Sequence, residues 1–407
     1  MRYLTSELLG FLSEESKMAF IAGPRQVGKT TLAKDLLDRD AFYFNWDIQS
    51  HRKKLVRDPE DFWRQAGIVS EGKKPRIVLD EIHKYPRWKR FLKGLYDAHG
   101  KSIEILVTGS GKLETYQKGG DSLLGRYHLY HLHPFTLGEL LRPERGPILP
   151  PQEFWKALTD RLDSIPVEAE EGLQQIERFT GFPEPLFGGS ETKMRRWSLD
   201  HQNLIIREDL RDLTRIREIG LLESMVVLLP ERVGSLLSIN ALREDLGVNF
   251  LTVQSWLAAL ERLFFLLEIR PYAGRLSRSL RREGKVYLFD YSVIDNPTKR
   301  FENLVCLHLL KLCDAWTDLG YGDFHLWFVR DQQKREVDFL ITERRKPYAL
   351  IETKMNWQNP DPSLRYFTEL LKPVHSLQIA RNTAKGKRPY SHKGILCLPA
   401  THFLYWF

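Results

Sequence analysis

The stretch that decides the fold is GPRQVGKT, residues 23–30. It fits the pattern G-x-x-x-x-G-K-[ST] with Gly23, Gly28, Lys29 and Thr30. Glycines let the backbone bring its N–H groups close to phosphates, and the following helix adds the positive end of its dipole. The lysine reaches the β- and γ-phosphates, and the hydroxyl ligates magnesium. The stretch therefore predicts a site for ATP or GTP with Mg2+. The residues predicted to form it are Gly23, Pro24, Arg25, Gln26, Val27, Gly28, Lys29, Thr30 and Thr31.

Short apolar runs around this loop predict the sheet that carries it. They alternate with helical segments, as in a parallel sheet that is buried on both faces. Residues 30–38 are expected to form the helix after the loop. The expected strands are 18–22, 42–46, 76–80, 103–108 and, as a fifth, 128–135. The predicted fold class is α/β.

Two acids follow the apolar run at residues 76–79 and complete the predicted site. Asp80 is expected to hold the magnesium ion, directly or through water. Glu81 is the candidate base that orients the attacking water. Two solvated acids at a strand end are the simpler alternative, but the glycine loop about 50 residues upstream favours the catalytic interpretation.

Three further residues are candidates for contact with the nucleotide. Thr108 and Ser110, in VTGSG at 107–111, end the next apolar run and could touch the γ-phosphate or the attacking water. Arg126, in SLLGR, could reach the nucleotide of a neighbouring subunit and stabilise charge in the transition state. This role predicts a homo-oligomer. A small-residue turn and an ordinary surface arginine are the alternatives.

A helix-turn-helix pattern lies downstream of the Pro-rich, linker-like stretch 142–151. Residues 238–263 show two helical patterns around the turn GVN, and two strand-like runs follow, so the order predicts a winged helix. The segment Arg275–Lys285 between those strands is rich in arginine and could neutralise phosphates of DNA or another nucleic acid. The alternatives are a solvated basic loop, and a winged helix that serves as a lid or subunit contact.

Four residues near the C-terminus form the pattern of a metal-dependent phosphodiester hydrolase. Asp338 and Glu352 flank the turn ERRKP, so a hairpin places them on adjacent strands. Glu352 and Lys354 point to one face because side chains alternate along a strand. Two carboxylates could then hold one metal ion while the lysine orients a water, with Glu302 as a third acid. The alternative is a catalytically silent domain that serves for docking.

Segments along nearly the whole chain resemble, in the same order, those of the AAA-type ATPases (AAA_14-like) that carry a C-terminal DUF4143 domain. The resemblance rests on GPRQVGKTTL, RIVLDEIHKYPRWKRFLKGLYD, ILVTGS, SLLGR, LHPFTLGEL, TGFPEP, IREDLRDL, FENLV, REVDFLI and ALIETK. It implies a P-loop NTPase parallel sheet of AAA+ type with a helical lid over residues 1–215, and a winged-helix domain over 216–292. Residues 293–407 are then a restriction-endonuclease-like α/β domain, and its acids resemble those of PD-(D/E)xK nucleases. One departure is Thr180, where the family usually has glycine.

Composition leaves the partner class open. The formal net charge of +8 and the pI near 9.2 permit contact with nucleic acid but do not require it. No apolar run reaches the length of a membrane-spanning helix, and the N-terminal residues lack the pattern of a signal peptide. Cys306, Cys313 and Cys397 lack metal-ligand spacing and are expected to be buried, reduced thiols of a cytoplasmic protein.

We therefore expect a cytoplasmic, Mg2+-dependent ATPase that acts on nucleic acid or protein. Two other functions remain open. One is an ATP-regulated, metal-dependent DNA nuclease built on the C-terminal acids. The other is a slow nucleotide switch that serves as a partner-binding scaffold. The family resemblance favours ATP over GTP, and the guanine-reading motif N-K-x-D is not found in the sequence.

Overall fold

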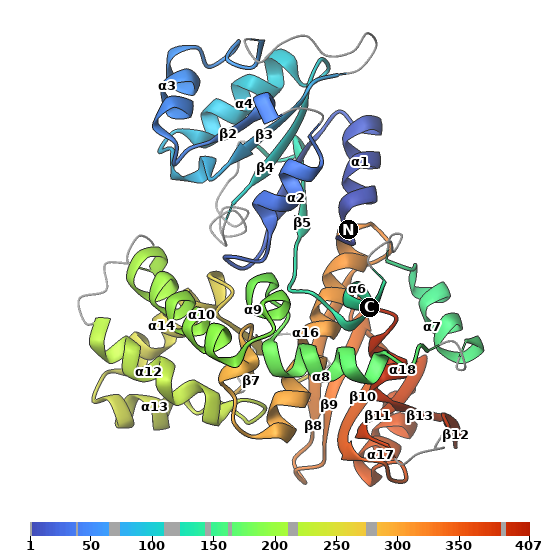
Figure 1. Cartoon of the computed structure of the whole chain (residues 1–407). Coiled ribbons are helices and arrows are strands. Elements are labelled where there is room, and N and C mark those ends of the chain that lie inside the picture. Colours follow the sequence, from blue (N-terminus) through green and yellow to red (C-terminus); the bar gives the residue numbers. More distant parts are fainter. Residues whose placement is uncertain are drawn as a thin grey trace. The chain divides into compact units, whose positions relative to one another are not determined.

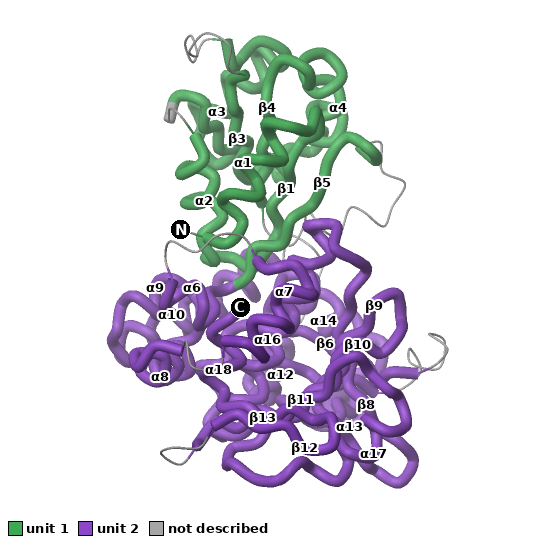
Figure 2. The backbone as a smooth tube through the Cα atoms, turned by 90° about the vertical axis from the view of Figure 1, so that its right-hand side faces the viewer, with its two compact units in different colours: residues 1–133, 144–147 green, residues 134–143, 148–407 purple. Residues whose placement is uncertain are grey.

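The chain, described here by a computed structural model, forms two compact units (Figure 2). One comprises residues 1–133 with 144–147, and the other residues 134–143 with 148–407. The residues that the structure describes are 2–37, 40–64, 74–109, 123–142, 148–161, 165–210, 219–273, 283–383 and 388–407.

A five-stranded parallel sheet with the strand order β2-β3-β4-β1-β5 is the centre of the first unit (Figure 1). Its strands are β1 (Met18–Ala22), β2 (Tyr43–Asn45), β3 (Arg76–Asp80), β4 (Glu104–Thr108) and β5 (Tyr127–His131). The helices of this unit include α1 (Thr5–Glu14), α2 (Lys29–Asp35), α3 (Gln49–Arg57) and α4 (Trp88–His99). Strand β1 is wholly apolar and wholly buried, because it lies between two neighbouring strands. The predicted parallel α/β sheet is confirmed, with small differences at the strand ends.

Helices make up the first half of the second unit. They are α6 (Leu137–Leu141), α7 (Pro151–Asp160), α8 (Ala169–Phe179), α9 (Pro183–Gly188), α10 (Glu191–Leu204), α12 (Ile219–Arg232), α13 (Ile239–Leu246) and α14 (Phe250–Arg262). The predicted helix pair is α13 and α14, separated by Gly247 in the left-handed conformation. The antiparallel hairpin of β6 (Leu266–Ile269) and β7 (Lys285–Leu288) follows. These elements agree with the predicted order, and the name winged helix stays a prediction.

A six-stranded mixed sheet with the order β12-β13-β11-β10-β9-β8 forms the C-terminal part of the second unit. Its strands are β8 (Phe324–Arg330), β9 (Glu336–Glu343), β10 (Lys346–Asn356), β11 (His375–Asn382), β12 (Tyr390–His392) and β13 (Ile395–Pro399). Its helices are α16 (Pro297–Asp318), α17 (Pro362–Leu371) and α18 (Ala400–Leu404). The long helix α16 packs on β8, β9 and β10. The short edge strand β12 was not predicted. All three cysteines are buried and free, as expected.

Helix α6 is attached to α16 by buried polar contacts. Thr136 caps α6, and Glu139 completes a capping box with it. The Lys311 amine lies 2.6 Å from a Glu139 carboxylate oxygen and 3.0 Å from the Thr136 hydroxyl. The backbone N–H of Leu137 donates to Nε2 of His308. Since the side chains of Lys311 and Glu139 are each 1% exposed, this ion pair is fully removed from water.

Thr180 ends helix α8 in a backbone conformation that few residues other than glycine adopt. Its φ is 62° and its ψ is 173°, and its side chain is completely buried. This geometry gives a physical reason for the glycine that the family resemblance leads one to expect here. Over the described residues, no helix is long and apolar enough to cross a membrane.

Candidate functional site

The glycine loop lies between the end of β1 and the start of α2, against the chain that leaves β5. Gly23 has φ 153° and Gly28 has φ 99°, and Gly28 caps α2 in the left-handed conformation. A Cβ atom added to Gly23 would lie 2.2 Å from the carbonyl oxygen of Leu132. The loop therefore needs glycine at this position to pass the neighbouring backbone.

Lys29 places its amine inside this loop. The residue is 8% exposed, and Nζ donates to the carbonyl oxygens of Gly23 at 2.9 Å and Pro24 at 2.6 Å. A buried ammonium requires such partners. The loop thus holds a cation at the position where the sequence pattern predicts contact with phosphate.

Asp80, at the end of β3, is the centre of a hydrogen-bond network. One carboxylate oxygen accepts from the Thr30 hydroxyl at 2.8 Å, the Tyr43 hydroxyl at 2.6 Å and the Asn45 amide at 3.3 Å. The other oxygen accepts from the Thr108 hydroxyl at 2.5 Å. In the sheet register, Asn45 and Thr108 are the neighbours of Asp80 on β2 and β4. Parallel strands therefore bring these side chains to one edge of the sheet.

This network joins predicted and unpredicted residues. Thr30 and Asp80, the predicted magnesium ligands, lie in direct contact. Tyr43 was not predicted, because it belongs to an apolar run; in the sheet it lies opposite Val78, two residues before Asp80, and its hydroxyl reaches the Asp80 carboxylate. Burial, followed by the hydrogen bond to Asp80, raises the pKa of Tyr43, so the hydroxyl remains a donor. Thr108 is a predicted contact of the γ-phosphate or the attacking water, and this role stays a prediction; its hydroxyl donates to Asp80.

Glu81 follows Asp80 in a left-handed backbone conformation with φ 55°. Its carboxylate lies 3.3 Å from the Lys84 amine and 3.7 Å from the His83 ring. Lys84 also pairs with Asp47 at 2.6 Å. Burial is the main cause that raises the pKa of Glu81. The predicted base therefore lies beside Asp80 with a lysine as its partner.

Arg126 has an acidic partner in its own chain. Its guanidinium donates to the Asp97 carboxylate at 2.8 Å and 3.2 Å. Ser110, the other candidate for contact with the γ-phosphate, lies outside the described residues.

The C-terminal acids surround a lysine that the sequence analysis placed elsewhere. Lys285 is 2% exposed, and its amine lies 2.7 Å from Glu336, 3.4 Å from Glu302 and 3.6 Å from Asp338. This position corrects one expectation, since a buried lysine cannot contact a nucleic-acid backbone. Burial is the main cause that raises the pKa of Glu302 to about 7. Arg275, Arg278, Arg281 and Arg282 lie outside the described residues.

The predicted neighbours Asp338 and Glu352 do lie on adjacent antiparallel strands. A Glu352 oxygen accepts from the Asp338 backbone N–H at 3.3 Å. Lys354 lies on the same face as Glu352 and pairs with it at 2.5 Å, and with Asp361 at 3.0 Å. In the part of the chain that the structure describes, however, no three His, Cys, Asp or Glu side chains are arranged to hold a metal ion.

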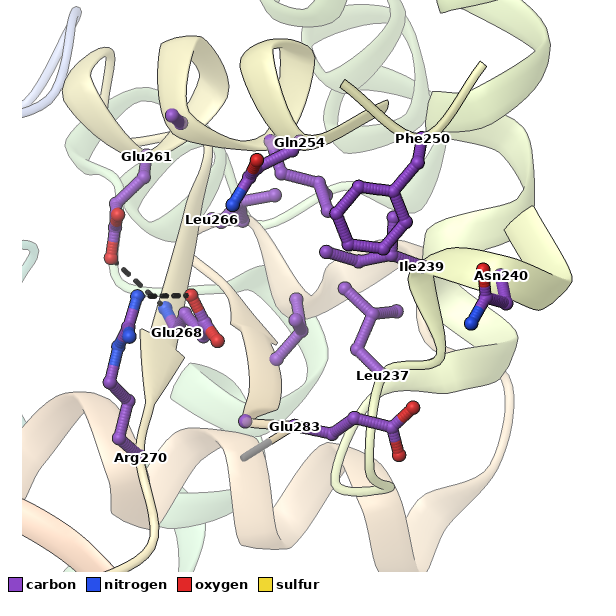
Figure 3. Close-up of a pocket in the computed structure, with 14 residues that line it drawn as sticks. Leu237, Ile239, Asn240, Phe250, Gln254, Glu261, Leu266, Glu268, Arg270 and Glu283 are labelled. Carbon is purple, nitrogen blue, oxygen red and sulfur yellow. Dashed lines mark hydrogen bonds and ion pairs between the residues drawn. The ribbon is translucent and has the colours of Figure 1, made fainter. Parts of the chain in front are cut away.

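A pocket of about 300 Å³ lies beside α14 and the β6–β7 hairpin (Figure 3). Apolar side chains form much of its wall, including Leu237, Phe250 and Leu266. Three acids border it, Glu261, Glu268 and Glu283, and the lining residue Arg270 pairs with Glu268 at 3.2 Å. This acidic border disfavours contact with a phosphate backbone.

Three family models match the chain. An AAA domain model matches residues 15–141, and a DUF4143 model, a domain of unknown function, matches residues 298–403. The chain is an AAA-type protein with a C-terminal DUF4143 domain. Between the two, a further domain of unknown function, DUF8612, matches residues 171–300. The glycine loop, Asp80 and Glu81 thus belong to the AAA domain, and Asp338, Glu352 and Lys354 to the DUF4143 domain.

The relatives of this AAA-type protein add little about its role. Two uncharacterized proteins, from Mycobacterium tuberculosis and Mycobacterium bovis, are each 22% identical over 341 residues, covering 82% of this chain and 69% of theirs. A solved Walker-type ATPase of Pyrococcus abyssi is similar at 15% identity and a TM-score of 0.41, covering 73% of this chain and 94% of its own. AMPPCP-bound DnaA from Aquifex aeolicus is similar at 14% identity and a TM-score of 0.30, covering 63% and 86%. Scores this low carry no argument about this chain.

Proposed function

We propose that this chain binds ATP with Mg2+ at residues 23–31 and hydrolyses it. The observation that carries the proposal is the 2.8 Å hydrogen bond from the Thr30 hydroxyl to the Asp80 carboxylate. Lys29, the residue before Thr30, is buried. A hydroxyl and a carboxylate suit Mg2+, and an amine suits the β- and γ-phosphates. When bound, the metal ion neutralises the charge on the phosphates. The match to an AAA domain model supports the same function.

Each residue around Asp80 then has a defined role. Lys29 exchanges its two loop carbonyls for phosphate oxygens. Tyr43, Asn45 and Thr108 hold the Asp80 carboxylate in one orientation through their hydrogen bonds. Such partners limit the rotation of a ligand before the metal arrives. We assign Thr108 this positioning role.

Glu81 is the proposed base. Its raised pKa, caused mainly by burial, makes it a better proton acceptor. Lys84 and His83 both lie against Oε2 of this carboxylate, so Oε1 is the oxygen that we propose to face the attacking water.

Turnover and binding measured in parallel test these roles. Lys29→Ala is expected to lose ATP binding. Glu81→Gln is expected to keep binding and to lose about 10²–10⁴-fold in kcat, the usual contribution of a general base. Glu15→Gln, at a side chain that is 52% exposed, is the matched control and should behave as wild type. Full binding by Lys29→Ala would disprove the site, and wild-type turnover by Glu81→Gln would disprove the base.

The proposed trans-acting role of Arg126 has a matched control in its own ion pair. Arg126→Ala and Asp97→Ala both remove the contact of 2.8 Å, but only the first removes the guanidinium. If Arg126 acts on the nucleotide of a neighbouring subunit, Arg126→Ala alone should lose turnover. ATP should also shift the measured mass toward that of an oligomer. Equal effects of both substitutions would contradict this role. A wild-type protein that stays monomeric with and without ATP, and still hydrolyses ATP, would contradict it as well.

The proposed target of the hydrolysis is nucleic acid or protein, with residues 216–292 as a winged-helix domain. The order of α13, α14 and the β6–β7 hairpin supports this assignment. The acidic border of the pocket in Figure 3 disfavours DNA on that face. ATP turnover measured with DNA, RNA or protein fractions distinguishes the target classes, because only the true partner class is expected to stimulate it.

A further inference from the structure

The carboxylate cluster of the DUF4143 domain already contains a cation. Glu302 extends from α16, and Glu336 and Asp338 extend from β9. The amine of Lys285, at the start of β7, lies 2.7–3.6 Å from an oxygen of each of these acids. An ammonium has three donors, so this one amine can engage all three carboxylates.

A divalent metal ion needs the same oxygens. Mg2+ and Mn2+ bind carboxylates at about 2.0–2.2 Å, so a metal held by Glu302 and Asp338 would lie within a few ångströms of the ammonium. Two like charges at such a distance in a buried site repel strongly. The metal could bind only after Lys285 left, and this residue is 2% exposed.

Glu336, which is not part of the predicted nuclease pattern, and Glu352, which is, have further basic partners. Arg330 lies 2.5 Å from the second oxygen of Glu336. Lys354 lies 2.5 Å from Glu352. Lys354 belongs to the predicted pattern itself, so Lys285 is the cation that the pattern does not include. The strands that carry Asp338 and Glu352 are adjacent, as the pattern predicts, but the amine of Lys285 lies beside the oxygens of Glu302 and Asp338 that a metal ion would need.

We infer that Lys285 is the resident cation of this cluster and prevents the DUF4143 domain from binding a divalent metal. A phosphodiester hydrolase of the predicted type needs that metal. The domain then does not work as a metal-dependent nuclease. The inference is independent of ATP hydrolysis, because it concerns residues of the DUF4143 domain and β7 only.

Binding of Mn2+ alone, followed by electron paramagnetic resonance on the full chain, tests this inference. All samples carry Asp80→Asn, so that the nucleotide site adds no strong metal site. The parent should show no site that depends on Asp338. Lys285→Met keeps an unbranched side chain, one atom shorter, and removes its charge. It should gain one saturable Mn2+ site at least about tenfold tighter than any site of the parent. Adding Asp338→Asn should abolish that site.

Two outcomes would overturn the inference. One is a Mn2+ site in the parent that is lost with Asp338→Asn, because the cluster would then accept metal while Lys285 is present. The other is a folded Lys285→Met protein without a new site. If Lys285→Met is too unstable to purify, the parent titration still decides the first point. A Mg2+- or Mn2+-dependent cleavage of plasmid DNA that Asp338→Asn removes would also refute it.

Discussion

Substitution of Lys311 by methionine should destabilise the second unit severely. Lys311 and Glu139 are 2.6 Å apart, and both side chains are 1% exposed. Without the lysine, the Glu139 carboxylate loses its partner at 2.6 Å, whereas the capping-box contact from the Thr136 N–H at 3.4 Å remains. Removal of one partner of a buried ion pair costs about 3–5 kcal/mol, against a total unfolding free energy of about 5–15 kcal/mol. We therefore expect Lys311→Met to lower the melting temperature by roughly 10 °C.

Urea denaturation of the wild type and three variants measures this effect. Lys311→Met with Glu139→Leu should recover most of the loss, because no charge then remains buried. Lys299→Met, at the start of the same helix, is the matched control and should cost less than about 1 kcal/mol. A loss below about 1 kcal/mol in Lys311→Met would refute the reasoning, as would a double variant no more stable than the single one.

Two more predictions concern the loop and the protonation of the second unit. Gly23→Ala should abolish ATP binding in a fluorescent-analogue titration, since its Cβ would lie 2.2 Å from the Leu132 oxygen, whereas Gly94→Ala, with open space around it, should bind normally. Unaltered affinity of Gly23→Ala would contradict this view of the loop. Burial lowers the pKa of His308 to about 3, and its Nε2 accepts from Leu137. Between pH 3 and about 6.5 the unfolded state holds more protons, so the stability that His308 contributes is complete above about pH 6.5 and is lost as the pH falls, by up to ~1.4 kcal/mol per unit. The His308→Gln variant should lack this slope in urea unfolding at several pH values, and parallel curves for both proteins would exclude the assignment.

The AAA domain could be predicted well because its signals are local. The residue pattern of the loop predicts its turn, and the apolar runs predict the strands. Asp80 is the polar residue that ends one of these runs. Tyr43 could not be found in this way, because a tyrosine within an apolar run looks like part of the core. Its contact with Asp80 depends on the pairing of β2 with β3, which is a tertiary fact.

The DUF4143 domain was predicted less completely for a related reason. The hairpin of β9 and β10 follows from alternation and a turn, so the proximity of Asp338 and Glu352 was predictable. Lys285 was not, because it ends the segment that begins at Arg275, and the four arginines of that segment suggest an exposed basic loop. Only the packing of β7 beside α16 and the sheet reveals that its amine is buried among acids. The strand β12 was missed because it is short and lies at an edge of the sheet.

In the phosphate loop, the carbonyls of Gly23 and Pro24 hold the same amine that the proposed ATP ligand would bind. Because the Lys29 amine already donates to Gly23 and Pro24, ATP binding is an exchange of hydrogen bonds rather than a simple gain. In such an exchange the net benefit is about 0.5–1.5 kcal/mol per bond, well below the strength of the bond itself. The same carbonyls can recapture the amine as soon as the γ-phosphate has left. We therefore expect the loop to moderate the affinity for nucleotide and to hasten the departure of the product.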